Sequence, residues 1–292
     1  MMNCINRQTF KQKIKSYRHQ PLSLLLYIAV CASALITAGV VIFLIGYILY
    51  HGLPNLTLPG LFAWDFNAEN QSMTPAIINT VIMILLTLLL AVPVGVFAAI
   101  YLVEYSKRGN KLVKVIRITA ETLSGIPSIV YGLFGYIVFV ITLGWSFTLL
   151  SGVITMAIMI LPLIMRTTEE ALMAVPDSFR EGSFGLGAGK LRTVFRIVLP
   201  SAMPGILSGV ILAIGRIVGE SAALLFTAGF GLKLNGFVKS LRTSSATLTV
   251  ALYVYASEQG KIDVAFAIAL ILMVLTLIIN FAAGFAGKHL KR

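Results

Sequence analysis

The chain has 292 residues, of which 58% are hydrophobic and only 12% are charged. Soluble domains of average composition carry about 25% charged residues. Because this chain has half that share and several apolar runs near 20 residues, it is predicted to be a polytopic membrane protein. The net charge of +12 does not indicate nucleic-acid binding, since no basic stretch is interleaved with aromatic residues for base stacking.

The N-terminal part predicts a basic cytoplasmic tail followed by an uncleaved membrane span. Residues 1–21 hold five Lys or Arg and no acidic residue. The apolar run 22–50 is far longer than the core of a signal peptide, which has about 7–15 residues. Residues 51–74 then form a loop without Lys or Arg, in which Trp64 and Phe66 are expected at the membrane interface.

Residues 75–287 are interpreted as one bundle containing five further spans. The segment 246–257 is too short to cross about 30 Å of hydrocarbon and is predicted to be interfacial or re-entrant. Lys and Arg gather on the cytoplasmic side of membrane proteins. With the N-terminus inside, the inner segments, including the basic C-terminus 288–292, hold most of the 23 Lys and Arg. Six spans with both termini in the cytoplasm are therefore expected, the last five covering about 75–103, 119–143, 147–165, 202–228 and 264–287.

The polar stretch from Glu181 to Pro200 interrupts these apolar runs. It contains four glycines within eight residues, too many for a strong continuous helix, since each costs about 1 kcal/mol relative to Ala. The stretch that follows has apolar residues at helical spacing. We therefore predict two short helices joined by a glycine turn at 187–189, the second with one apolar face formed by Leu191, Val194, Phe195 and Val198.

This stretch is not a nucleotide-binding loop. The phosphate-loop pattern requires Gly five residues before Gly189, where Phe184 stands, and Ser or Thr after Lys190, where Leu191 stands. The chain is therefore not expected to hydrolyse ATP itself. Cys4, Cys31 and three well-separated histidines indicate neither a disulfide framework nor a metal site.

The span 202–228 contains two charges, Arg216 and Glu220, four residues apart and so expected on one helix face. Arg216 lies about 20 Å from the start of the span, where a charge costs at least about 2.5–3.5 kcal/mol and is expected to face the bundle interior. Arg216 suits an oxyanion because its planar fork binds two oxygens, with Glu220 as its partner in the empty state. The alternative is a structural pair that neutralises itself. For Glu121 we favour hydration or pairing with Arg117.

The polar stretch resembles the EAA signature of ABC-importer permeases, in which EAA is followed after three residues by Gly and after nine more by I-x-LP. Gly182 and Ser183 depart from the usual Ala-Ala, although both are small. The resemblance implies that the loop 166–201 is the coupling element that seats in a groove of a cytoplasmic ATPase, with the matched positions at Glu181, Gly187, Ile197, Leu199 and Pro200.

Further motifs resemble the phosphate-transporting members of this class: GIPSIVYGLFGY at 125–136, ILPLIMRTTEEALMAVPDSFREG at 160–182 and GRIVGESAALLFTAG at 215–229. The resemblance implies an all-α type I ABC-importer fold and a role for Arg216 and Glu220 in the substrate pathway. It also implies three partners: a PstC-like second permease subunit, a PstB-like ATPase dimer that holds ATP and Mg, and a PstS-like phosphate-binding protein. No cofactor is expected on this chain.

The sequence thus predicts a non-enzymatic permease of an ATP-driven importer of inorganic phosphate in a bacterial plasma membrane, working by alternating access. Three alternatives remain open. The substrate is another oxyanion, such as sulfate or molybdate; the protein is an ion-coupled secondary transporter; or it is a membrane scaffold or sensor that transports nothing.

Overall fold

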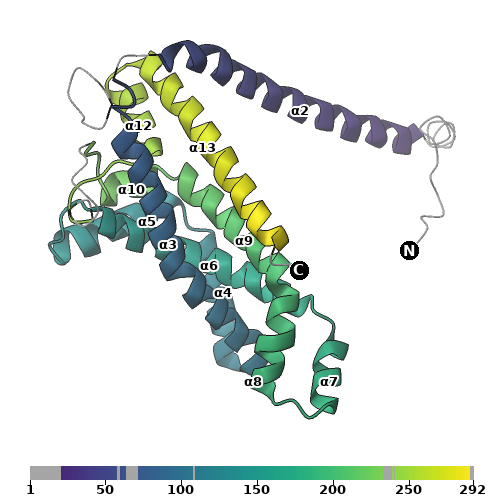
Figure 1. The fold of residues 1–292 in the computed structure, drawn as a ribbon. Coiled ribbons are helices and arrows are strands. Elements are labelled where there is room, and N and C mark those ends of the chain that lie inside the picture. Colours follow the sequence, from purple (N-terminus) through teal and green to yellow (C-terminus); the bar gives the residue numbers. More distant parts are fainter. Residues whose placement is uncertain are drawn as a thin grey trace. The chain divides into compact units, whose positions relative to one another are not determined.

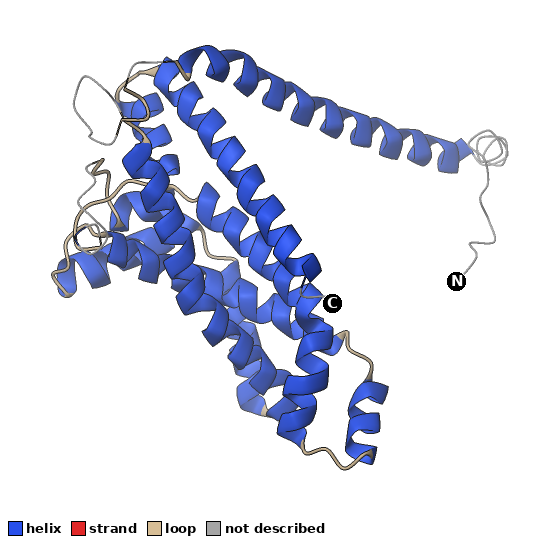
Figure 2. Ribbon diagram, in the orientation of Figure 1, coloured by secondary structure: helices blue, strands red, loops and turns tan. Residues whose placement is uncertain are grey.

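A computed structural model describes residues 21–57, 60–63, 72–107, 109–232, 239 and 241–289. Within these residues the protein is helical and contains no strand (Figure 2). The chain divides into two compact units, residues 1–51 and 52–292. The basic tail 1–20, the expected interface residues Trp64 and Phe66, and residues 290–292 lie outside the described residues.

The first unit contains most of helix α2 (Pro21–Asn55), which confirms the helix predicted for 22–50. Its large apolar side chains are exposed along the whole length, from Leu22 to Tyr50. A helix of this length that is apolar all round is what a membrane span requires.

The second unit is built around three long helices, α3 (Thr74–Ile100), α6 (Leu149–Met173) and α9 (Leu199–Gly219) (Figure 1). Helix α6 packs extensively against both α3 and α9. The approach to α9 is close because Gly205 and Gly209 face α6, and a Cβ on Gly209 would lie only 2.2 Å from the Thr167 hydroxyl. Small residues thus allow tight helix packing, as expected inside a membrane bundle.

The number of apolar helices agrees with the six predicted spans. Five helical stretches are long and apolar enough to cross a membrane: 22–55, 74–105, 149–173, 190–219 and 262–285. A sixth is obtained if one sharply bent pair, 111–124 with 128–142, counts as a single broken span.

That bent pair corrects the prediction of a continuous helix over 119–143. Helix α4 (Lys111–Ser124) ends at Gly125, and α5 (Ser128–Gly135) with the π-helix η2 (Tyr136–Thr142) continues at an angle of 100°. The break has a local cause, since Pro127 disfavours helical geometry in the residue before it. The Tyr131 hydroxyl donates to the Leu123 carbonyl at 2.8 Å, so one side chain ties the two arms together.

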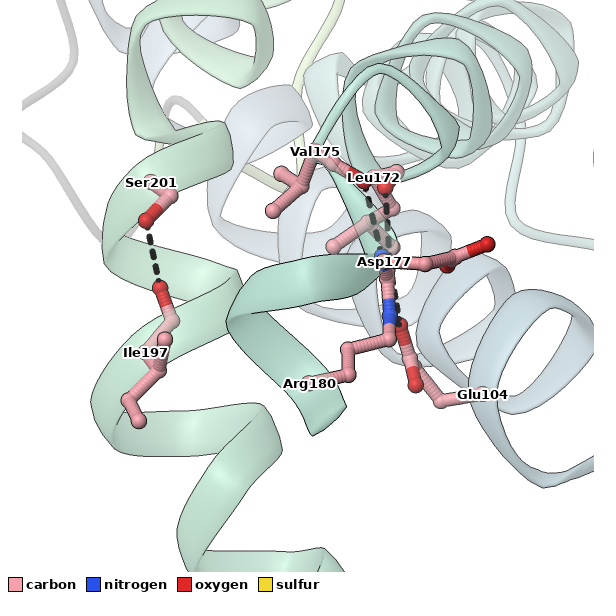
Figure 3. A network of polar contacts seen from close by, with 7 residues as sticks. All are labelled: Glu104, Leu172, Val175, Asp177, Arg180, Ile197 and Ser201. Atoms are coloured by element: carbon pink, nitrogen blue, oxygen red, sulfur yellow. Dashed lines mark hydrogen bonds and ion pairs between the residues drawn. The ribbon is translucent and has the colours of Figure 1, made fainter. Parts of the chain in front are cut away.

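The predicted span 202–228 also differs from the structure at both ends. It begins earlier, because α8 (Lys190–Thr193) and the π-helix η3 (Val194–Val198) run without a break into α9. Pro200 lies in the first turn of α9, as predicted, and the Ser201 hydroxyl donates to the Ile197 carbonyl at 2.7 Å (Figure 3). The helix stops at Gly219, and α10 (Ala222–Thr227) is a separate short helix.

The segment 246–257, predicted to be too short to span, forms α12 (Leu248–Tyr253) and the π-helix η4 (Val254–Glu258). Its start is buried against α3: the Thr80 hydroxyl accepts from the Leu248 amide at 2.9 Å, and the Asn79 amide donates to the Ala246 carbonyl at 3.3 Å. Two further helices complete the described fold, α7 (Asp177–Gly185) and α13 (Ile262–His289), and α3 is extended by the π-helix η1 (Tyr101–Tyr105).

A substitution at Gly132 tests the close packing of α5 on α10. A Cβ at this position would lie 2.7 Å from the backbone Cα of Ala223, which cannot move aside as a flexible side chain would. Gly132→Ala is expected to lower the free energy of unfolding by about 1–3 kcal/mol through overpacking, measured by thermal unfolding in detergent. The matched control is Gly284→Ala in α13, where a Cβ meets nothing within 4 Å. Equal melting temperatures for both variants would contradict the packing.

Candidate functional site

We call residues 177–200 the docking segment, which contains α7, a turn, α8 and η3. The first short helix and the glycine turn are confirmed: Gly187 has φ +83°, and the Ala188 amide donates to the Ser183 carbonyl at 3.1 Å. The second predicted short helix is wrong, because the helix that begins at Lys190 continues to Gly219. This left-handed conformation is one that residues with a Cβ rarely adopt. The turn reverses the chain, so that α7 and α8 lie beside each other (Figure 1).

The two departures from the EAA pattern have different environments. Ser183 is buried, and its hydroxyl lies 2.8 Å from the hydroxyl of Thr193 in α8. This bond fixes α7 to α8, which an alanine would not do. Gly182 faces open space, with nothing within 4 Å of the position of a Cβ, so a small residue there is not required by packing within this chain.

The docking segment exposes an apolar surface formed by Phe184, Leu186, Leu191 and Phe195. Leu186, at the tip of the turn, is 91% exposed, and Leu191 is 65% exposed. The predicted single apolar face of 191–198 is therefore divided, because Val194 and Val198 are buried against the bundle whereas the other two residues are not. Several large apolar side chains exposed in one segment are typical of a protein-interaction surface, and Glu181 in the same segment is also exposed.

Arg180, which no sequence pattern singled out, anchors α7 to the bundle (Figure 3). Its Nε and Nη2 donate to one carboxylate oxygen of Glu104 in η1, at 3.0 and 2.8 Å. Its Nη1 and Nη2 donate to the carbonyls of Val175 and Leu172, at 2.8 and 2.9 Å. Asp177 accepts a further bond at 3.2 Å. One guanidinium therefore joins three segments of the protein.

This ion pair is shielded from solvent, since the Arg180 and Glu104 side chains are 14% and 8% exposed. The two residues lie 76 positions apart, and in the sequence each looks like an ordinary charge at the end of a span. Only their positions in the sequence could have drawn attention to these two residues. Glu104 is the only acid at the end of the apolar run 75–103, and Arg180 directly precedes the EAA-like stretch.

Arg216 and Glu220 do not share a helix face, contrary to the sequence-based expectation. Glu220 follows the end of α9 and has extended backbone angles, φ −82° and ψ 124°. Its carboxylate accepts from the Ala223 amide at 3.0 Å, and its carbonyl accepts from the Thr249 hydroxyl at 2.8 Å. Within the described residues no ion pair joins it to Arg216. Glu220 therefore acts as a cap for α10.

Arg216 is half-buried in α9, and the next two residues, Ile217 and Val218, belong to the same buried cluster as Tyr131. Tyr131 holds the bend between α4 and α5. The guanidinium, the bend and the break at Glu220 thus belong to one region of the bundle. One continuous helix links this region to the docking segment: 26 residues, about 40 Å at 1.5 Å per residue, separate Lys190 at the start of α8 from Arg216.

Glu121 is exposed. It does not pair with Arg117, which was one of the two possibilities predicted from the sequence. Arg117 instead pairs with the buried Glu169 at 2.5 Å, and Glu121 lies 3.9 Å from Arg166. Within the described part of the chain no three His, Cys, Asp or Glu residues are arranged to hold a metal ion.

The sequence is similar to a family of transport proteins and to individual members of that family. Residues 91–292, more than half of the chain, match the family described as binding-protein-dependent transport system inner membrane component. The probable ABC transporter permease protein YqgI of Bacillus subtilis is 33% identical over 89% of this chain and 92% of its own length. The phosphate transport system permease protein PstA 1 of Mycobacterium tuberculosis is 36% identical over 72% of this chain and 68% of its own length.

Solved structures share the fold at low sequence identity. A chain of a bacterial alginate ABC transporter, solved in complex with an alginate pentasaccharide-bound periplasmic protein, superposes with a TM-score of 0.63 at 17% identity. The match covers 94% of this chain and 98% of that one. The inward-facing MetNI methionine ABC transporter matches with a TM-score of 0.59 at 19% identity, over 76% of this chain and 95% of that one.

Removing Arg180 tests the buried ion pair. Arg180→Ala leaves the Glu104 carboxylate buried without its cation and is expected to lower the free energy of unfolding by about 3–5 kcal/mol, measured by thermal unfolding in detergent. The double variant Arg180→Ala with Glu104→Gln is expected to be less destabilised than Arg180→Ala alone, because no unpaired charge remains. Arg166→Ala is the control: its exposed pair with Glu170 is worth at most about 1 kcal/mol. Equal effects of the Arg180 and Arg166 substitutions would contradict the assignment.

Proposed function

The chain belongs to the family of inner membrane components of binding-protein-dependent transport systems, and we propose that it is the membrane-spanning permease of an ATP-driven importer of inorganic phosphate. The observation that carries this proposal is the guanidinium of Arg216 within the helix bundle, without a carboxylate partner among the described residues. The phosphate-transport names of relatives such as the mycobacterial permease support the choice of substrate.

The chemistry of Arg216 suits a phosphate ion. Arg keeps its charge at any physiological pH and presents planar donors that bind two phosphate oxygens at once. Because the carboxylate of Glu220 is engaged by the Ala223 amide, it does not neutralise Arg216. A passing oxyanion therefore meets a cation whose hydrogen-bonding capacity is available.

Transport requires a source of energy outside this chain. We propose that the docking segment seats on a PstB-like ATPase dimer, which holds ATP and Mg, and that the chain is itself non-catalytic. The exposed apolar residues at the turn, Leu186 and Leu191, supply the contact surface. A PstC-like second permease would complete the pathway, and a PstS-like binding protein would deliver phosphate from outside.

The membrane orientation follows from the distribution of charge. The positive-inside rule places the docking segment, the basic tail and the C-terminus in the cytoplasm of a bacterial cell, with the plasma membrane as the location. The segment then lies on the side where ATP is present.

Experiment can distinguish this function from two others. A permease for sulfate or molybdate would use the same cation, since these ions also present oxygens to a guanidinium, and only competition separates them from phosphate. An ion-coupled secondary transporter would take up its substrate without an ATPase, and the exposed apolar turn would then lack a partner.

Arg216 gives the direct test in vesicles that contain the complete complex. Arg216→Ala is expected to reduce ATP-dependent phosphate uptake roughly 10- to 100-fold, the equivalent of losing a charged hydrogen-bonded contact of about 1.5–3 kcal/mol. Arg216→Lys is expected to retain part of the activity because it keeps the charge, and Arg166→Ala should transport at the wild-type rate. Excess sulfate and molybdate should not compete.

Undiminished uptake by Arg216→Ala would contradict the assigned role of this residue. The proposed substrate would be contradicted if sulfate or molybdate suppressed wild-type uptake as strongly as unlabelled phosphate does.

A further inference from the structure

Helix α7 has two different connections to the long helices of the bundle. The first is covalent and runs through the turn into α8, η3 and α9, a helix unbroken from Lys190 to Gly219. The buried bond between Ser183 and Thr193 makes α7 and α8 one unit. The second connection is the guanidinium of Arg180, which binds Glu104 at the end of α3 and the carbonyls at the end of α6 (Figure 3).

The second connection uses the whole donor capacity of arginine. The guanidinium has five N–H groups, and the structure shows five contacts, to Glu104 twice and once each to Leu172, Val175 and Asp177. Lysine, with three donors on one nitrogen, could not make this set. Two of the acceptors are backbone carbonyls at the end of α6, where few later amides remain to bind them; the Leu172 carbonyl also accepts from the Val175 amide at 3.3 Å. Arg180 therefore caps α6 and binds α3 at the same time.

We propose that Glu104 and Arg180 are positioning residues that transmit movement of the docking segment to α3. The proposal rests on the proposed function in one respect, namely that α7 is the part contacted by the ATPase. The covalent route moves α9, which carries Arg216, and the ion pair moves α3. Both routes act together when α7 shifts, so the helices on the two sides of α6 move in concert.

The geometry favours a transmitting role over simple attachment. Glu104 lies in η1, the π-helical turn that continues α3, so a displacement of this residue acts directly on the end of that helix. A buried pair of this kind resists separation, because each charge would be left without its partner. A pull on α7 therefore reaches η1 rather than breaking the contact.

The first experiment measures coupling in the complete complex reconstituted in liposomes. The variants are Arg180→Gln, Glu104→Gln and the double variant, with Arg166→Gln as the control on an exposed ion pair. Each single variant is expected to lower the phosphate transported per ATP hydrolysed by roughly 5-fold or more, while ATP hydrolysis stimulated by the loaded binding protein persists. The double variant should be no worse than either single variant, because the two residues act as one unit. An unchanged transport ratio in all three variants would overturn the proposal.

The second experiment uses the wild-type complex and so does not depend on the folding of any variant. Hydrogen exchange is compared with and without ATP trapped on the ATPase. ATP is expected to change exchange both in residues 177–185 and in residues 101–105. A change in 177–185 with none in 101–105 would overturn the proposal. Because this measurement needs no phosphate, a complex that accumulates none but shows both changes would refute the proposed substrate while the inference stands.

Discussion

A helix that stops inside an apolar bundle leaves backbone N–H and C=O groups without partners, and these groups have no water to bind. In this protein, polar side chains from neighbouring segments bind them. Glu220 accepts from the amide of Ala223, Thr249 donates to the carbonyl of Glu220, and Tyr131 donates to the carbonyl of Leu123. The irregular backbone of the bundle depends on these few bonds.

The same hydrogen bonds fix the end of the helix that carries Arg216 and so fix the position of its charge. Because α9 ends at Gly219, Arg216 lies in the last turn of a long helix, and its neighbours Ile217 and Val218 share a buried cluster with Tyr131, which holds the bend. The Glu220 carboxylate binds a backbone amide at the break and does not neutralise the charge of Arg216. At the other end of the same helix, the docking segment is fixed by the Ser183–Thr193 bond and by Arg180. One helix thus connects a surface suited to a partner with a cation suited to an oxyanion.

The features predicted correctly from the sequence have local causes. Apolar length indicates the long helices, and Gly187 indicates the turn because its left-handed backbone is unfavourable with a Cβ. The break at Glu220 was missed because it depends on Thr249, 29 residues away, within what reads as one apolar run. The bend at Pro127 had a local signal, but the run of apolar residues around it favoured a single span. The pairing of Arg180 with Glu104 joins residues 76 positions apart, and no periodicity or motif connects them.

We propose that this membrane protein moves phosphate only when an ATPase drives it through the docking segment. The most direct test is purification of the chain from the membranes of its own cells in mild detergent, with identification of the bound proteins and phosphate uptake by the same sample in vesicles. We expect the chain to co-purify with a stoichiometric ATPase and a second permease, and we expect uptake to require ATP and added binding protein. Purification of the chain without an ATPase, in a form that accumulates phosphate from an ion gradient alone, would contradict it.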